Sequence, residues 1–157
     1  FLNAFGGIFE NSRWVAERAF ELELGPAHDT AIGMHSALSR SFRSASKIKK
    51  LEVLKAHPDL AGKLLISNNL TKASTSEQES AELDKLTEEE FSIFSNLNHR
   101  YFEKHRFPFI VAVRDYDKKG ILNLFRDRLE NDTELEFDSA CAQVVRIAYI
   151  RLQDILP

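Results

Sequence analysis

The sequence predicts an all-α protein in which residues 1–157 form a single domain, an irregular bundle of about seven to nine helices. Three observations support this prediction. Apolar residues recur at spacings of three and four in most windows. Residues that commonly cap helices precede several of these windows. Only one segment has a strand-like composition, and it has no second strand to pair with.

The first half of the chain contains four expected helices. Gly25-Pro26 ends the second of them, and Asp29 is expected to cap the third. The fourth should stop at about His57, because Pro58 lacks an N–H and disfavours helical geometry in the residue before it. The four helices are expected within residues 1–10, 14–22, 30–43 and 47–57.

The second half contains a loop followed by four more expected helices. The loop covers residues 62–71, and Ser74 is expected to open a helix that runs to about residue 84. Thr87 and Glu90 have the spacing of a capping box at the start of a long helix. The next helix follows Lys119-Gly120, and Asp132 or Thr133 is expected to cap the last one.

The segment Phe107–Val113 interrupts the helical pattern. It is apolar throughout, partly β-branched and far too short to span a membrane. We expect a buried segment that is irregular or forms one helical turn, whose N–H groups a polar substrate could satisfy. Arg114, at its end, could bind a substrate carboxylate through paired hydrogen bonds. Alternatively, Arg114 could pair with Asp115 or Asp117 at the surface.

Composition excludes several classes of function. The net charge of -3 gives no basic surface, so nucleic acid is not an expected partner. No run approaches the roughly 18 apolar residues of a membrane span. The single cysteine, Cys141, excludes an internal disulfide, is expected in the core and fits a cytoplasmic location. Because the chain begins at Phe1 and not at Met, we expect that a start residue or tag has been trimmed.

Two local patterns have both a structural and a functional interpretation. His57 is either a capping or core histidine in a tight turn, or an acid/base group at an element boundary, where sites tend to lie. Ser74 and Glu77 have the spacing of a capping box, but a helix start can also bind anions. The other histidines show no metal-binding spacing, so no metal site is expected.

Five motifs, taken together and in order, resemble the OHCU decarboxylase family. That family converts 2-oxo-4-hydroxy-4-carboxy-5-ureidoimidazoline to (S)-allantoin in urate degradation. Each motif alone is weak, but the ordered set is specific, and the similarity covers nearly the whole chain. The motifs are His57-Pro58-Asp59-Leu60-Ala61-Gly62-Lys63, Leu70-Thr71, Ser74-x-x-Glu77-Gln78, Leu97-Asn98-x-x-Tyr101 and Phe107-Pro108-Phe109-Ile110-Val111-Ala112-Val113-Arg114.

The resemblance implies a helical homodimer that acts on the small ureidoimidazoline without a metal or organic cofactor. It implies that His57 is the catalytic acid/base. We expect Glu77, as the second catalytic residue, to orient His57 or to bind the ureido N–H groups of the substrate. The other residues expected to line the substrate, with Arg114 added from its position, are Pro58, Ser74, Thr75, Ser76, Gln78, Phe109, Ile110, Val111, Ala112 and Val113.

The chain departs from the family pattern at two positions. Arg106 stands where the family usually has the glycine before Phe-Pro-Phe. Glu82, between Ala81 and Leu83, stands where the family usually has the glycine of Ala-Gly-Leu. Neither is a matched catalytic position. If the glycine replaced by Arg106 had positive φ, however, the backbone ahead of the substrate segment would be affected.

Two other classes of function remain alternatives at this stage. A phenylalanine-rich helical domain could be a non-catalytic module that binds an amphipathic helix, and such a module would not be stabilised by allantoin. A metal-dependent hydrolase would lose its activity on chelation.

Overall fold

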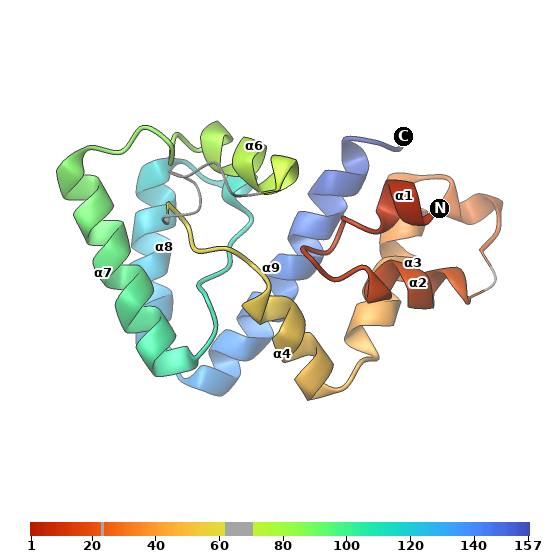
Figure 1. The fold of residues 1–157 in the computed structure, drawn as a ribbon, viewed down its shortest axis with the longest axis horizontal. Coiled ribbons are helices and arrows are strands. Elements are labelled where there is room, and N and C mark those ends of the chain that lie inside the picture. Colours follow the sequence, from red (N-terminus) through yellow and green to blue (C-terminus); the bar gives the residue numbers. More distant parts are fainter. Residues whose placement is uncertain (23, 62–70) are drawn as a thin grey trace. The chain divides into compact units, whose positions relative to one another are not determined.

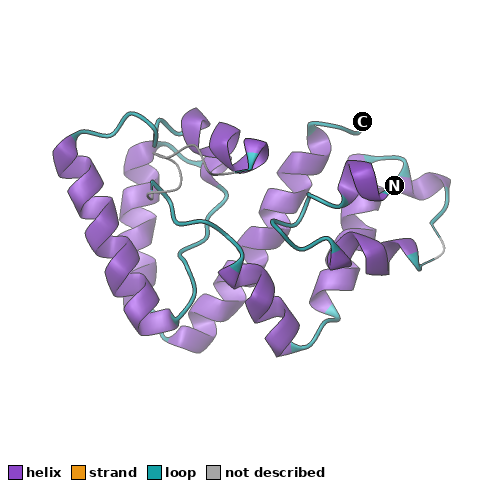
Figure 2. Cartoon of the chain, in the orientation of Figure 1, coloured by secondary structure: helices purple, strands orange, loops and turns teal. Residues whose placement is uncertain are grey.

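The computed structural model describes residues 1–22, 24–61 and 71–157. Within these ranges the chain forms eight α-helices and two 3₁₀ helices and contains no strand (Figures 1 and 2). The prediction of an all-α fold with seven to nine helices is therefore confirmed. The described residues separate into two compact units, one made of residues 1–57 and 144–157 and the other of residues 58–143. The single domain expected over residues 1–157 stays a prediction.

The first unit is built around α3 and the residues that pack on it. Phe9 and Phe42 place their rings 5.2 Å apart in its core, and the Ser41 hydroxyl donates to the Val15 carbonyl of α2. Gly33 allows η1 to approach α3, because a Cβ there would lie 1.7 Å from the Ala27 carbonyl oxygen. Its elements are α1 (Leu2–Phe5), α2 (Trp14–Phe20), η1 (Pro26–His28), α3 (Ala31–Arg43), α4 (Lys47–Lys55) and the end of α9 (Thr133–Gln153).

The second unit contains the irregular segment 107–112 and the helices around it. Its helices are α6 (Lys72–Ser80), α7 (Glu88–His105), η2 (Val113–Asp115), α8 (Lys118–Glu130) and the first part of α9. Here α7 packs against α8 (Figure 1), and α6 contacts η2.

Aromatic rings hold the segment Phe107–Val113 in the core of the second unit. All seven residues except Pro108 are buried hydrophobic side chains, and Pro108 is buried as well. Phe109 stacks on Phe125 at 3.9 Å, and Tyr101 meets Phe107 and Phe109 edge-on. The segment has no regular structure before η2. The expectation of a buried, irregular segment ending in one helical turn is confirmed.

The helix starts were predicted with mixed success. Thr87 and Glu90 form the expected capping box, and Asp132 accepts from the Leu135 amide at the start of α9. Two predictions were wrong. Thr30, and not Asp29, caps α3. Thr71, and not Ser74, caps α6, where its hydroxyl accepts from the Ser74 amide, so Ser74 lies inside the first turn. The loop expected at 62–71 falls outside the described residues except for Thr71.

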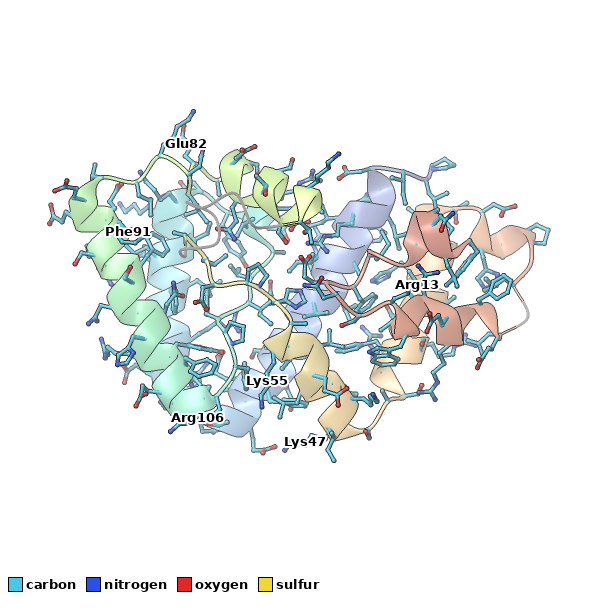
Figure 3. All side chains as sticks on the ribbon, viewed as in Figure 1. Arg13, Lys47, Lys55, Glu82, Phe91 and Arg106 are labelled. Carbon is cyan, nitrogen blue, oxygen red and sulfur yellow. The ribbon has the colours of Figure 1, made fainter. Side chains whose placement is uncertain are left out.

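Both positions where the resemblance implies glycine have left-handed backbone. Arg106 ends α7 with φ of 65°, and Glu82 follows α6 with φ of 57°. Figure 3 labels both residues, in the connections at the two ends of α7. A left-handed residue with a Cβ costs roughly 1–2 kcal/mol, a cost that glycine avoids.

We predict that Arg106→Gly and Glu82→Gly each raise the free energy of unfolding by about 1 kcal/mol, because glycine removes the steric cost of positive φ. Thermal unfolding followed by circular dichroism measures the change. The matched control is Arg100→Gly, an exposed position inside α7, which should lose about 1 kcal/mol. A loss of stability at position 106 or 82 would contradict the prediction.

Candidate functional site

His57 follows the end of α4, where the sequence predicted that the helix would stop. Its imidazole is half-buried, and its Nδ1 lies 3.0 Å from the Val53 carbonyl oxygen. A carbonyl oxygen can only accept, so the neutral ring carries its proton on Nδ1. The lone pair is then on Nε2, which makes Nε2 the atom able to accept a proton.

Burial is the main effect on the pKa of His57, and it lowers that pKa below the usual value of 6.5. The hydrogen bond to Val53 opposes this effect. The Arg151 guanidinium lowers the pKa further, whereas the Glu10 carboxylate raises it. Lowering the pKa favours the neutral imidazole at neutral pH. The ring is therefore ready to act as a base.

Glu10 and Arg151 form a buried ion pair in the same unit as His57. Their charged atoms lie 2.9 Å apart, and both side chains are at most 6% exposed. Arg151 also donates to the Ile8 carbonyl at 3.2 Å. Sequence reasoning missed this pair. The available signal was that Arg151 lies on the same helix face as Ala148 and next to Leu152, both fully buried.

In the second unit, side-chain amides hold the turn that follows Pro58. The Gln78 carbonyl oxygen accepts from the Ala61 amide at 2.8 Å, and its NH2 group donates to the Asp59 carbonyl at 3.4 Å. Asn98 donates to the Leu60 carbonyl at 2.8 Å. Three consecutive residues of the turn are thus fixed by side chains. Gln78, predicted to bind substrate, uses both ends of its amide on this backbone.

The other predicted residues of α6 differ in exposure. Ser74 is buried, Thr75 and Glu77 are half-buried, and Ser76 is exposed. The Thr75 hydroxyl donates to the Thr71 carbonyl within the helix. Since α6 contacts η2, the second unit brings this helix next to the end of the buried apolar segment.

Side chains bond two of the backbone polar groups of the buried segment. Arg128 donates to the Ile110 carbonyl at 2.6 Å, and the Gln143 carbonyl oxygen accepts from the Ala112 amide at 2.9 Å. In contrast, the backbone of Val111 makes no hydrogen bond with another described residue. Arg114, the last predicted residue, is exposed on η2. The segment therefore presents polar backbone groups inside an apolar environment.

The predicted residues are divided between the two units. His57 ends the first stretch of the first unit, and all the others, from Pro58 to Arg114, belong to the second. In the described part of the chain, no three His, Cys, Asp or Glu side chains are grouped so as to hold a metal ion. None of the described helices has the length and apolar character that crossing a membrane requires.

Comparison with protein families gives one match over almost the whole chain. The model of the OHCU decarboxylase family matches residues 1–153. A 2-oxo-4-hydroxy-4-carboxy-5-ureidoimidazoline decarboxylase of Haloferax volcanii is 38% identical over 154 residues, which cover 98% of this chain and 88% of that protein. The uric acid degradation bifunctional protein PucL of Bacillus subtilis is 34% identical over 98% of this chain and 30% of its own length.

Solved structures show the same fold. The crystal structure of an (S)-allantoin synthase superposes with a TM-score of 0.72 at 31% identity, covering 98% of this chain and 48% of that one. An OHCU decarboxylase crystallised in the presence of (S)-allantoin also gives a TM-score of 0.72, over 94% of both chains. At 20% identity, the second comparison supports the fold alone.

Proposed function

This chain belongs to the OHCU decarboxylase family, and we propose that it converts 2-oxo-4-hydroxy-4-carboxy-5-ureidoimidazoline to (S)-allantoin and CO2. The observation that carries the proposal is the family match over residues 1–153. The reaction class is that of a carboxy-lyase acting in urate degradation. The residue roles are part of the proposal. The family resemblance implies them, and the local geometry of His57 supports them.

The chemistry requires a place for the electron pair left when CO2 departs. In this substrate the ring C=N bond can accept it, so that a C=C bond forms between the two ring carbons as the C–COO⁻ bond breaks. The ring nitrogen gains a proton from solvent, which is the one proton that the overall reaction consumes. The neighbouring hydroxyl then loses its proton to become a carbonyl, and the ureido-bearing carbon gains one. The substrate supplies its own electron sink, and we propose that the enzyme uses no metal or organic cofactor. Unchanged turnover after dialysis against a chelator tests this.

We propose that His57 moves the protons. The neutral ring has its lone pair on Nε2, because Nδ1 is bonded to the Val53 carbonyl. Nε2 would accept the hydroxyl proton and return it to one face of the ureido-bearing carbon. Delivery to a single face gives the S product. General acid/base catalysis of this kind contributes typically 10²–10⁴-fold.

The second unit would bind the substrate. The Ser74 side chain would hold a substrate carbonyl oxygen, because the Ser74 and Thr75 amides already donate to Thr71. Glu77 would orient His57 or accept hydrogen bonds from the ureido N–H groups. The backbone of residues 109–113 would bind the ring amide edges, which is supported by the buried amide and carbonyl of Val111. The proposed set is completed by Pro58, Thr75, Ser76, Gln78 and Arg114.

We further propose a homodimer located in the cytoplasm. Large apolar side chains exposed in the first unit are available for a dimer interface, among them Phe20 at 59% and Ile32 at 70% exposure. Sedimentation equilibrium decides the oligomeric state. The cytoplasmic location rests on the single cysteine, Cys141.

We predict that His57→Asn reduces turnover by 10²–10⁴-fold, because asparagine cannot exchange a proton. Substrate is generated in situ from urate, and circular dichroism separates enzymatic (S)-allantoin from the racemate formed by spontaneous decay. Production of (S)-allantoin by His57→Asn at the wild-type rate would mean that His57 is not the acid/base.

We predict that Glu77→Gln lowers turnover while the melting temperature changes little. Glutamine is a good helix former of the same shape, but it lacks the charge that would orient His57 or bind the ureido group. Steady-state kinetics and thermal unfolding are measured on the same preparation. Glu79→Gln, an exposed position on α6, is the matched control. Equal kinetics for both variants would remove Glu77 from the mechanism.

We predict that kcat/KM falls on the acidic side with an apparent pKa below 6.5. The active form has neutral His57, and burial lowers the pKa of this ring, so protonation inactivates the enzyme only below the usual histidine range. The pKa values of His35 and His105 are also lowered, mainly by burial. As the pH falls, these three histidines therefore take up protons in the unfolded chain before they do so in the folded chain. The free energy of unfolding consequently decreases as the pH falls below 6.5. Melting temperatures at each pH separate the two effects, and an acidic limb at or above 6.5 in folded protein would contradict the prediction.

A further inference from the structure

A single buried arginine contacts two consecutive residues of the irregular segment. Arg128 of α8 donates from Nη1 to the Ile110 carbonyl at 2.6 Å, and its guanidinium lies 4.5 Å from the centre of the Phe109 ring. The Arg128 side chain is only 8% exposed. Hydrogen bonds from charged donors are the strong ones, so this contact fixes where the Ile110 carbonyl points.

Glu136 of α9 holds Arg128 in this position. Its carboxylate is fully buried and lies 2.9 Å from Nη2 and 3.1 Å from Nε of Arg128. It also accepts from the Tyr101 hydroxyl and from Asn131. Burial alone would raise the pKa of Glu136, but the hydrogen bonds from Arg128, Tyr101 and Asn131 outweigh burial and lower that pKa. The carboxylate is therefore charged, and four donor groups fix its orientation.

The same helix that supplies Tyr101 also holds the turn after His57. Asn98 lies three residues before Tyr101 on α7, where spacing by three places side chains on one face. Asn98 donates to the Leu60 carbonyl at 2.8 Å. One face of α7 is thus bonded directly to the turn 58–61 and, through Glu136 and Arg128, to the segment 109–113.

We propose that Asn98, Tyr101, Arg128 and Glu136, which we name the α7 brace, are positioning residues that set the spacing between the Leu60 and Ile110 carbonyls. These carbonyls belong to the turn 58–61 and to the segment 109–113, which flank or bind the substrate in the proposed function. The inference therefore rests on that proposed function. The brace acts through the backbone, and the Leu97-Asn98-x-x-Tyr101 motif is explained by it.

Stability alone does not account for the brace. Replacing a buried ion pair by apolar residues of similar volume is often neutral or stabilising. Apolar residues in place of Arg128 and Glu136 would therefore give the fold an equal or higher free energy of unfolding. Irregular backbone has no hydrogen-bond ladder to fix its geometry. A displacement of about 1 Å in a catalytic arrangement can cost 10²-fold in rate. Geometric control of the segment is the function that requires these charges.

The test is the triple variant Tyr101→Phe/Arg128→Met/Glu136→Leu, which keeps the packing volume but removes the donor to Ile110. We expect KM, and the Kd for (S)-allantoin measured by calorimetry, to rise 10–100-fold, with a smaller change in kcat. Arg126→Met, at an exposed position of the same helix, is the matched control and should leave both constants unchanged.

A second variant keeps the proposal testable if the triple variant does not fold. Asn98→Leu removes only the bond to the Leu60 carbonyl from a half-buried side chain, and it should raise KM about tenfold. If either variant is folded and has the KM and allantoin Kd of the wild type, the brace serves stability only and the proposal is overturned. If the wild-type chain neither turns over the ureidoimidazoline nor binds allantoin, the proposed function itself fails. The two failures are therefore distinguishable.

Discussion

The constraint from which much of this structure follows is the burial of the irregular backbone between Phe107 and Val113. A helix satisfies its own N–H and C=O groups, whereas an irregular segment in an apolar core must obtain partners from elsewhere. Here Arg128 and Gln143 supply two of them. A buried guanidinium then requires a buried carboxylate, which is Glu136. The remaining lone pairs of Glu136 require donors in turn, and Tyr101 and Asn131 provide them.

The first unit contains a similar arrangement of a buried arginine, a carboxylate and a backbone carbonyl, with fewer residues. Arg151 pairs with the buried Glu10 and donates to the Ile8 carbonyl, which lies in the non-helical stretch before α2. In each unit a guanidinium joins a carboxylate to a carbonyl of irregular backbone. One member of each ion pair, Glu136 or Arg151, comes from α9.

Local features of the fold could be predicted from the sequence, and long-range ones could not. The end of α4 near His57, the Thr87 capping box and the buried irregular segment depend on neighbouring residues, so they were predicted correctly. The cap of α6 was misassigned because Ser74 and Thr71 are both good caps, and only the backbone shows which one is used. The Glu10–Arg151 pair was missed because the two residues lie at opposite ends of the sequence, and the Arg128–Glu136 pair because its residues lie on different helices, α8 and α9. No local pattern indicates which of these charges pair. The roles of His57 and of the substrate-lining residues stay predictions.

The Glu10–Arg151 pair also explains why the pKa of His57 depends mainly on burial, although two charged side chains act on the imidazole. A lone buried arginine near the imidazole would repel the imidazolium and depress the pKa strongly, and a lone glutamate would raise it. The structure has both, and their effects on the pKa of His57 oppose each other. Burial and the Val53 hydrogen bond are then the larger influences, and both depend on backbone that α4 fixes. In the proposed reaction His57 accepts a proton and returns it, and this balance suits that role because strong stabilisation of either protonation state would slow one of the two transfers.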